Sequence, residues 1–410
     1  MERLTLLRRA PEYRRLFLAT LSSGAGTFLA AVALTVDVYD RTGSGTWVSA
    51  LLIADFLPII LIGFLLGPLV DRFSRRRMLV LSDLVRVGVF AALPFAGNAT
   101  TIVALALVSG IATGFFRPAV YAGMPNLVSE ADLPTANSLL QAAENLTWMI
   151  GPVVGGLLIS AQGADLAYWL NAVSFLASAL LVLRIPASRL QAGAIVSRGH
   201  WADLRDGFRF VLSSRALLAV LVVWNVVVLG NAAVNVGEVV LAKESLDAGT
   251  VGFGLLVGAA GLGLTVGSLA AAPLLDRVGL RGGYAGGIAL MALGFGTAAL
   301  APSLPLALVG VAVGGLGNGV AVVCNALLVQ RGAPDALRGR VFTVIMSSNY
   351  VLLGLGMAAA GLLVDTFGAR WLWAGAALVF ALAAATATVL ARGVGGAVAA
   401  GVEEPAASRV

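Results

Sequence analysis

Three acidic side chains lie inside long apolar stretches of the sequence. Asp55 stands in LLIADFLPIIL, Glu144 in LLQAAENLTWMIG and Glu238 in NAAVNVGEVVLA. A charged side chain is costly in the hydrocarbon layer of a membrane, so an acid kept there is a candidate functional group. Such a carboxyl group can bind a proton when it is shut off from water and release it when water reaches it. We therefore predict that these acids carry protons. The alternative is that each lies in a wet vestibule or pairs with an arginine and never titrates.

Further polar side chains follow the spacing of a helix. Asn231, Asn235 and Glu238 stand at positions i, i+4 and i+7, which places them in one stripe on one face. We predict that this stripe faces a central cavity and contacts a bound molecule there. Asn318 and Asn349 are predicted to line the same cavity from later helices. Hydrogen bonding between neighbouring helices is the alternative for these amides.

The helices that position these side chains are predicted to cross a membrane. The chain has 410 residues, of which 59% are hydrophobic and 12% are charged, whereas about 25% of the residues of a soluble domain are charged. Apolar runs long enough to cross a hydrocarbon core of ~30 Å recur from end to end. We predict twelve membrane-spanning helices, at residues 15–38, 48–69, 78–96, 101–122, 137–159, 166–184, 217–241, 251–275, 283–300, 304–328, 341–363 and 371–391.

The distribution of basic residues predicts the orientation of the chain. Arginines gather before the first predicted helix, between the second and third, and around the loop in the middle of the chain, and few lie on the alternate loops. Cytoplasmic loops of membrane proteins carry the excess of Arg and Lys, so we expect both termini in the cytoplasm. The net charge of +6 follows from this topology. Because the arginines are dispersed at helix ends, no nucleic-acid partner is expected.

The sequence also repeats with a period of half the chain. GPLVDRFSRRR at 67–77 is similar to APLLDRVGLRG at 272–282, an offset of 205 residues. The same offset pairs Gly110 with Gly315, Gly114 with Gly319, Gly156 with Gly361 and Gly163 with Gly368. Each half then holds six helices, and an even number places the halves in the same orientation, related by an axis along the membrane normal.

This repeat predicts the division of the chain. Residues 1–184 are expected to form an N-terminal six-helix bundle and residues 215–392 a C-terminal one. Residues 185–214 are predicted to be a cytoplasmic linker that contains an amphipathic helix, WADLRDGFRFVL. We expect residues 393–410 to be a disordered cytoplasmic tail. The predicted fold class is an all-α membrane protein of twelve helices in two pseudo-symmetric bundles.

Twelve helices in two sets of six, with a charged turn after the second and a weaker copy after the eighth, resemble the major facilitator superfamily. The loop signature of that superfamily, G-x-L-x-D-R-x-G-R-R, is matched here by Gly67, Leu69, Asp71, Arg72, Arg75 and Arg76, with Ser74 at the second glycine. The resemblance implies a cytoplasmic latch that joins the two halves when the transporter faces outward. Asp83, Arg86 and Arg117 are predicted to complete the latch, and Asp276 and Arg277 belong to its copy. The alternative is that these arginines only set the topology.

A second motif lies in the fifth predicted helix. MIGPVVGGLL contains G-P-x-x-G-G at Gly151, Pro152, Gly155 and Gly156. A proline kinks a helix, and glycines let two helices approach closely. The motif resembles the core of the antiporter motif of proton-coupled drug exporters, although Thr147 stands where the longer form has another glycine. The surrounding sequence, from FFRPAVYAGMPNLV onward, resembles the macrolide-efflux and enterobactin-exporter branch.

The resemblance implies a secondary transporter that exports a small amphipathic molecule, such as a drug, an antibiotic or a siderophore-like compound, by proton antiport and rocker-switch alternating access. The alternatives are a lipid or nutrient importer of the same fold and a non-transporting membrane receptor. No cofactor is expected, and the proton gradient is the expected energy source. The sequence contains neither a P-loop nor a metal-ligand cluster, so we do not predict an enzyme. We expect a monomer that contacts lipid in the inner membrane of a bacterium. The single cysteine, Cys324, excludes an intrachain disulfide.

Overall fold

The computed structural model describes residues 2–65, 73–190 and 200–399, and helices account for nearly all of them. The helices of the first half are α1 (Glu2–Arg9), α2 (Pro11–Thr42), α3 (Gly45–Leu65), α5 (Arg75–Ala92), α6 (Ala99–Gly123), α7 (Leu133–Gln162), α8 (Ala164–Leu183) and α9 (Ala187–Leu190). Those that follow are α10 (His200–Ser213), α11 (Arg215–Val240), α12 (Gly249–Leu300), α13 (Leu304–Gly332), α14 (Asp335–Phe367) and α15 (Ala369–Ala399). Short 3₁₀ turns follow α5 (η1, Leu93–Phe95) and α6 (η2, Met124–Asn126) and precede α7 (η3, Glu130–Asp132), and a π turn, η4 (Leu241–Ser245), continues α11.

Local sequence signals set several helix ends. Asn98 precedes α6, and its side chain accepts a hydrogen bond from the backbone N–H of Thr101 at 2.9 Å, which caps the helix. Pro11 opens α2, where its missing N–H costs nothing. Gly43 ends the same helix with a φ of 60°, a left-handed conformation that favours glycine.

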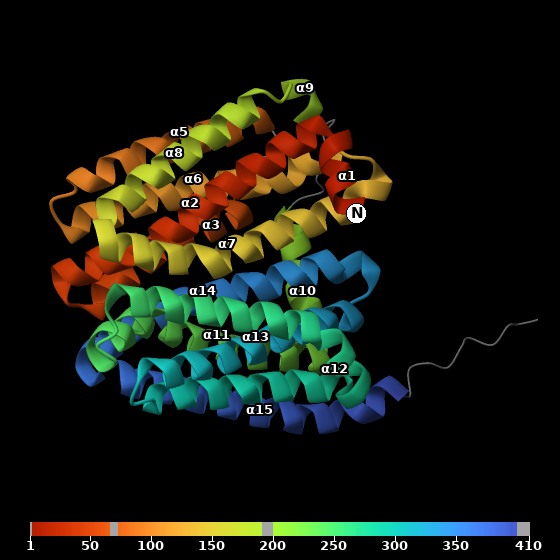
Figure 1. The fold of residues 1–410 in the computed structure, drawn as a ribbon. Coiled ribbons are helices and arrows are strands. Elements are labelled where there is room, and N and C mark those ends of the chain that lie inside the picture. Colours follow the sequence, from red (N-terminus) through yellow and green to blue (C-terminus); the bar gives the residue numbers. More distant parts are fainter. Residues whose placement is uncertain (1, 66–72, 191–199, 400–410) are drawn as a thin grey trace, which may run out of the picture.

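The helices form two groups that lie side by side (Figure 1). The N-terminal group contains α1–α9, and the C-terminal group contains α11–α15. The groups meet along two helix pairs, α7 against α12 and α3 against α14. Any site shared by the two groups must lie near these pairs.

Ten helices of the described residues are long and apolar enough to cross a membrane. One of them, α12, has 52 residues and is interrupted at Gly279, where φ is 72° and ψ is 166°. The sequence predicts two separate helices here, at 251–275 and 283–300, and the break falls between them. At the end of the chain, α15 continues to Ala399, so residues 393–399 of the predicted tail are helical. Residues 400–410 lie outside the described residues.

The internal repeat recurs in the geometry of the helices. Gly163 and Gly368 both link two consecutive helices with a φ of 81° and 82°. A Cβ atom on Gly110 would lie 2.4 Å from the carbonyl oxygen of Asp55, and one on Gly315 would lie 2.4 Å from that of Ala260. Asp55 and Ala260 are themselves 205 residues apart. Residues at this offset therefore hold equivalent places in the two groups.

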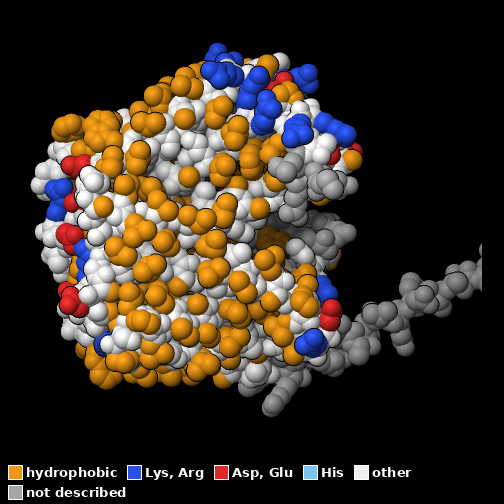
Figure 2. Space-filling model, viewed as in Figure 1, with side chains coloured by type: hydrophobic (Ala, Val, Ile, Leu, Met, Phe, Trp, Pro, Cys, Tyr) orange, Lys and Arg blue, Asp and Glu red, His pale blue; other side chains and the backbone are white. Residues whose placement is uncertain are grey.

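The two ends of the helix bundle differ in charge (Figure 2). We call the end that carries the N-terminus the basic end, since arginines of the N-terminal group gather there, namely Arg8, Arg9, Arg14, Arg15, Arg75, Arg76, Arg77, Arg184 and Arg189. The opposite end carries the acids Asp37, Asp40, Glu244 and Asp365. The surface is hollowed between the two groups at the basic end (Figure 2).

Candidate functional site

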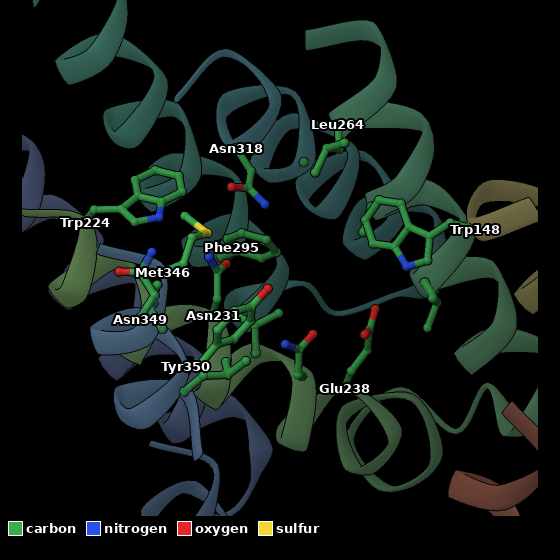
Figure 3. A pocket seen from close by; sticks show the side chains of 17 residues that line it. Trp148, Trp224, Asn231, Glu238, Leu264, Phe295, Asn318, Met346, Asn349 and Tyr350 are labelled. Atoms are coloured by element: carbon green, nitrogen blue, oxygen red, sulfur yellow. The ribbon is translucent and has the colours of Figure 1, made fainter. Parts of the chain in front are cut away.

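A cavity of about 410 Å³ lies mainly within the C-terminal group. Helices α11, α12, α13 and α14 supply its walls, and Trp148 of α7 closes it from the N-terminal group. Aromatic rings line it from several sides: Trp148, Trp224, Phe295 and Tyr350 (Figure 3). Apolar walls with a few polar groups are typical of a site for a small organic molecule.

The polar stripe predicted on one helix lies in the wall of this cavity. Asn231, Asn235 and Glu238 all line it from α11, and Asn318 of α13 lines it from another side (Figure 3). The Glu238 side chain is buried, with a residue exposure of 7%, and its Oε1 atom has no hydrogen-bond partner. Oδ1 of Asn318 also lacks a partner. Unpaired buried polar atoms are costly, so both atoms are available to a ligand.

The fifth predicted cavity residue, Asn349, is bonded to its neighbours as well as lining the cavity. Its amide is satisfied when the nitrogen donates to Oδ1 of Asn225 at 2.8 Å and the oxygen accepts from Nε1 of Trp224 at 3.2 Å. Ser348 also bonds Asn225. These bonds join α14 to α11 and fix the orientation of the Trp224 ring, which is the interhelical role considered as the alternative.

Glu144 lies elsewhere, beside the arginine that is predicted to belong to the latch. Its carboxylate accepts hydrogen bonds from Arg117 at 3.2 Å and from the Tyr121 hydroxyl at 3.2 Å. The side-chain exposure is 24% for Glu144 and 52% for Arg117. The alternative considered for the intramembrane acids, pairing with an arginine, therefore describes Glu144 in this structure.

Asp83 and Arg86 form a buried ion pair within the N-terminal group. Nη2 of Arg86 lies 2.5 Å from Oδ1 of Asp83, and the side-chain exposures are 3% and 0%. The pair is enclosed by α2, α6 and α8, rather than spanning the gap between the two groups. Asp55, on α3, is half-buried and interacts electrostatically with Arg86. Asp55 does not line the cavity.

Two other residues of the predicted latch bond backbone carbonyls at the end of α8 and on α9. Nη1 of Arg75 donates to the Leu190 carbonyl at 3.0 Å, and Nη2 of Arg76 donates to the Leu183 carbonyl at 2.5 Å. Gly67, Asp71 and Arg72 lie outside the described residues. Asp276 and Arg277 are exposed on α12, just before the break at Gly279.

Three glycines of the G-P-x-x-G-G motif place α7 between two helices. Cβ atoms on Gly151 and Gly155 would lie 2.7 Å from Cβ of Phe28 and 2.7 Å from the carbonyl oxygen of Leu29, both on α2. Gly156 faces the other way, where its Cβ would lie 3.2 Å from Cα of Gly254 on α12. The motif thus provides the close contact between the N-terminal and C-terminal groups.

The contacts that close the opposite end are absent from the sequence-based predictions. Asp365 of α14 accepts hydrogen bonds from Ser44, Gly45 and Thr46 at the start of α3. The Tyr39 hydroxyl donates to Glu244, and Lys243 pairs with Asp40. Ser49 of α3 donates to the Met357 carbonyl of α14 at 2.6 Å.

These bonds all lie in the same region of the structure. Each one joins the N-terminal group to the C-terminal group, and all of them lie in the half of the bundle nearer the opposite end. Tyr39 and Glu244 are 205 residues apart, so this bond joins residues at equivalent positions of the internal repeat. The structure is therefore tied together at the opposite end and hollowed at the basic end (Figure 2).

No cluster of three or more His, Cys, Asp and Glu side chains that could hold a metal ion occurs in the described part of the chain.

Comparisons with known proteins point to one class of membrane protein. The multidrug efflux pump Tap of Mycolicibacterium fortuitum is 29% identical over 379 residues, covering 89% of this chain and 92% of the pump. Tap of Mycobacterium tuberculosis (strain ATCC 25618 / H37Rv) is 30% identical, covering 88% of each chain. The enterobactin exporter EntS of Escherichia coli (O127:H6) is 26% identical, covering 87% of this chain and 86% of the exporter.

Solved structures share the fold at lower identity. The nucleoside transporter NupG matches with a TM-score of 0.78 at 13% identity, covering 93% of this chain and 99% of NupG. A bacterial homologue of the iron transporter ferroportin, solved in an inward-facing state, matches with a TM-score of 0.76 at 15% identity, covering 93% and 98%. The family model of the transmembrane secretion effectors matches residues 6–399. The chain therefore belongs to the transmembrane secretion effector family, within the major facilitator superfamily of membrane transporters.

Proposed function

We propose that this chain is a secondary transporter that exports a small amphipathic molecule in exchange for protons. Its relatives are multidrug and enterobactin efflux transporters, which supports the export direction. The protein would work as a monomer in the inner membrane, without a bound cofactor, and draw its energy from the proton gradient. Its basic end faces the cytoplasm, because cytoplasmic segments carry the excess of arginine.

The proposal includes twelve membrane spans. Ten described helices meet the criteria for a span. The eleventh is α3, whose apolar segment Gly45–Ile59 is shorter. The twelfth arises when α12 is divided at Gly279 into two spans. Each group of helices then contributes six.

Alternating access is supported by the unequal closure of the two ends. Among the described residues, the hydrogen bonds between the groups named above lie toward the opposite end, which supports a state in which the cavity is shut off from the outside. Export then requires these bonds to break while the basic end closes. The close contact of Gly156 with Gly254 lets α7 and α12 remain packed as the groups rock.

The lining of the cavity supports a neutral or cationic substrate. Of the charged side chains, only Glu238 lines the described cavity, together with amides and aromatic rings. A cation is attracted both to a carboxylate and to the face of an aromatic ring. An anionic molecule would meet no arginine or lysine there, so a siderophore-like anion fits the site less well than a cationic drug.

The observation that carries the coupling proposal is the unpaired carboxyl oxygen of Glu238 inside the cavity. A proton and a cationic substrate would compete for this group, so that binding of one releases the other. Glu144 is less suited to the role, since Arg117 and Tyr121 already bond it.

A transport assay tests the function. The protein is reconstituted in liposomes, a pH gradient is imposed, and the accumulation of ethidium and of a neutral macrolide is followed. We expect the pH gradient to drive accumulation. Each exchanged proton raises the concentration ratio of the substrate across the membrane about tenfold per pH unit, so Glu238→Gln should lower this ratio about tenfold per pH unit. Glu130→Gln, which neutralises an exposed acid outside the cavity, is the matched control and should behave like wild type. Accumulation that ignores the gradient would contradict antiport, and uptake in the reverse direction would indicate an importer.

A further inference from the structure

The buried charges of the N-terminal group have no role in the cavity described above. Asp83 and Arg86 are 0% and 2% exposed. Besides the 2.5 Å ion pair, Oδ2 of Asp83 accepts from the Ser178 hydroxyl at 2.7 Å, and Nη1 of Arg86 bonds the Ser23 hydroxyl at 3.3 Å. Two aromatic rings flank the guanidinium, with its carbon 4.4 Å and 4.2 Å from their centres. Four helices thus enclose one charged pair.

The internal repeat shows which residues occupy the equivalent positions in the C-terminal group. At the offset of 205 residues, Asp83 corresponds to Ile288 and Arg86 to Met291, both 0% exposed. The two serines correspond to Val228 and Ala383, which are also buried and apolar. The same place in the fold is therefore filled by hydrocarbon in the C-terminal group. Since a buried ion pair is often no more stabilising than apolar residues of similar volume, packing does not explain the charges.

Asp55 lies at a position whose equivalent in the C-terminal group faces the cavity. Its equivalent by the repeat is Ala260, which lines the cavity. Asp55 is half-buried, whereas Asp83 is fully buried. Asp55 forms no ion pair with Arg86 in this state, although the two groups interact electrostatically. Arg86 therefore interacts electrostatically with two carboxyl groups, those of Asp83 and Asp55, and forms an ion pair with Asp83.

Arg86 interacts electrostatically with both Asp83 and Asp55. Among the described residues, Arg86 and Ser178 are the side chains that act on Asp83, and Arg86 is the charge that acts on Asp55. Two other charged groups of the enclosing helices have partners of their own. On α6, Arg117 bonds Glu144, and on α2, Asp37 bonds Arg41. The cluster thus holds two acids and one base, a net charge of −1 that one proton would neutralise.

We propose that Asp55, Arg86 and Asp83 form a second proton-binding site, separate from the substrate cavity, with Asp55 as the group that takes up the proton. When Asp55 is charged, it competes with Asp83 for the guanidinium. When it is protonated, Arg86 bonds Asp83 alone, as in the present structure. A bare negative charge is costly in the membrane interior, so the charge state of Asp55 is tied to its access to water and hence to the state of the transporter. The protein then exchanges two protons per substrate, one at Glu238 and one at Asp55.

This inference rests on the proposed function, and the test separates the two. Ethidium accumulation is measured in liposomes held at zero membrane potential, over a series of pH gradients, until no net flux remains. The final concentration ratio grows about tenfold per pH unit for each proton exchanged. We expect about 100-fold per pH unit for wild type and about tenfold for Asp55→Asn. Asp165→Asn, an exposed acid at the start of α8, is the control and should keep the wild-type slope.

A second variant transfers the residues of the C-terminal group to the N-terminal one. Asp83→Ile combined with Arg86→Met removes the ion pair and keeps the packing found at the equivalent positions. If the pair served only packing, this variant would keep the 100-fold slope. We expect about tenfold, because Asp55 without its arginine keeps its proton throughout the cycle.

The outcomes are distinct. Absence of gradient-driven accumulation in wild type would contradict the proposed function itself. A wild-type slope of about tenfold, or an unchanged slope in Asp55→Asn, would overturn the second site and leave the proposed function standing. Ethidium binding in detergent checks each variant, and Asp55→Asn should bind within about twofold of wild type. Loss of binding in Asp55→Asn would contradict the separation of the two sites and also overturn the inference.

Discussion

Asp365 is the residue whose change should most directly shift the balance between the two ends of the transporter. It lies on α14 and accepts four hydrogen bonds from the first residues of α3, in the other group of helices. The distances are 2.5 Å to the Gly45 N–H, 3.1 Å to the Thr46 N–H and 2.7 Å to the hydroxyls of Ser44 and Thr46. A carboxylate at a helix N-terminus is also favoured by the helix dipole.

The variant Asp365→Asn keeps the shape of the side chain and removes its charge. The amide oxygen can take the place of Oδ2 and keep its three donors, but the NH₂ group then meets the Gly45 N–H, donor against donor. One hydrogen bond of about 1 kcal/mol and a dipole interaction of about 1 kcal/mol are lost. Together, about 2 kcal/mol shifts the equilibrium between the closed and open forms of the opposite end about 30-fold toward the open form.

Spin labels can report this shift. Cysteines at Thr100 and Ser303 place one exposed label on each group at the opposite end, and the native Cys324 is buried and does not compete for the label. Pulsed electron–electron resonance should show a larger population of long distances in Asp365→Asn than in wild type. Asp165→Asn, with the same change of charge at the same end and no bond to the other group, is the control. A distance distribution in Asp365→Asn that overlays wild type would refute the argument that these bonds hold the opposite end closed.

Three further changes test other contacts. Tyr39→Phe removes the bond to Glu244, worth about 1 kcal/mol, and should produce a smaller, roughly fivefold shift in the same label distances. Gly254→Ala would place a Cβ 2.5 Å from the Pro152 carbonyl oxygen, so we expect about 1–3 kcal/mol of lost stability in thermal unfolding, whereas Gly286→Ala, with nothing within 4 Å, should leave it unchanged. Trp148→Ala removes the ring that closes the cavity from the N-terminal group and should weaken ethidium binding up to about tenfold in a fluorescence titration; unchanged affinity would place the ethidium site elsewhere.

The position of the helices could be predicted from the sequence because it depends on local signals. The predicted helix 101–122 corresponds to α6, Ala99–Gly123, which begins at the cap supplied by Asn98. The break between the predicted helices 251–275 and 283–300 occurs at Gly279, a residue suited to a positive φ. Apolar run length, caps and glycines act over a few residues, so a single sequence contains them.

The contacts of charged residues could not be predicted in the same way, because each partner comes from a distant part of the chain. Asp83 and Arg86 follow the charged loop closely in sequence and were therefore expected in the latch, yet the structure encloses them within the N-terminal group. The repeat contained a usable signal, since their equivalents are the apolar Ile288 and Met291. Asp365 and Glu244 look like ordinary boundary charges, and only the packing of α14 on α3 and of α11 beside α2 gives them partners.

The two interfaces between the groups are equivalent by the repeat but differ in what holds them. Gly156 contacts Gly254 across α7 and α12, and at the offset of 205 residues Gly361 contacts Ser49 across α14 and α3. The first contact is glycine against glycine and has no side-chain bond to break. The second includes the Ser49 hydroxyl bond to Met357 and continues into the Asp365 cap. In the proposed rocker-switch movement, opening of the opposite end would have to break polar bonds along α3 and α14, whereas α7 and α12 would slide or pivot on a contact without side-chain bonds. If the proposed movement takes place, this difference predicts that its energetic barrier lies at the interface of α3 and α14 and its hinge at that of α7 and α12.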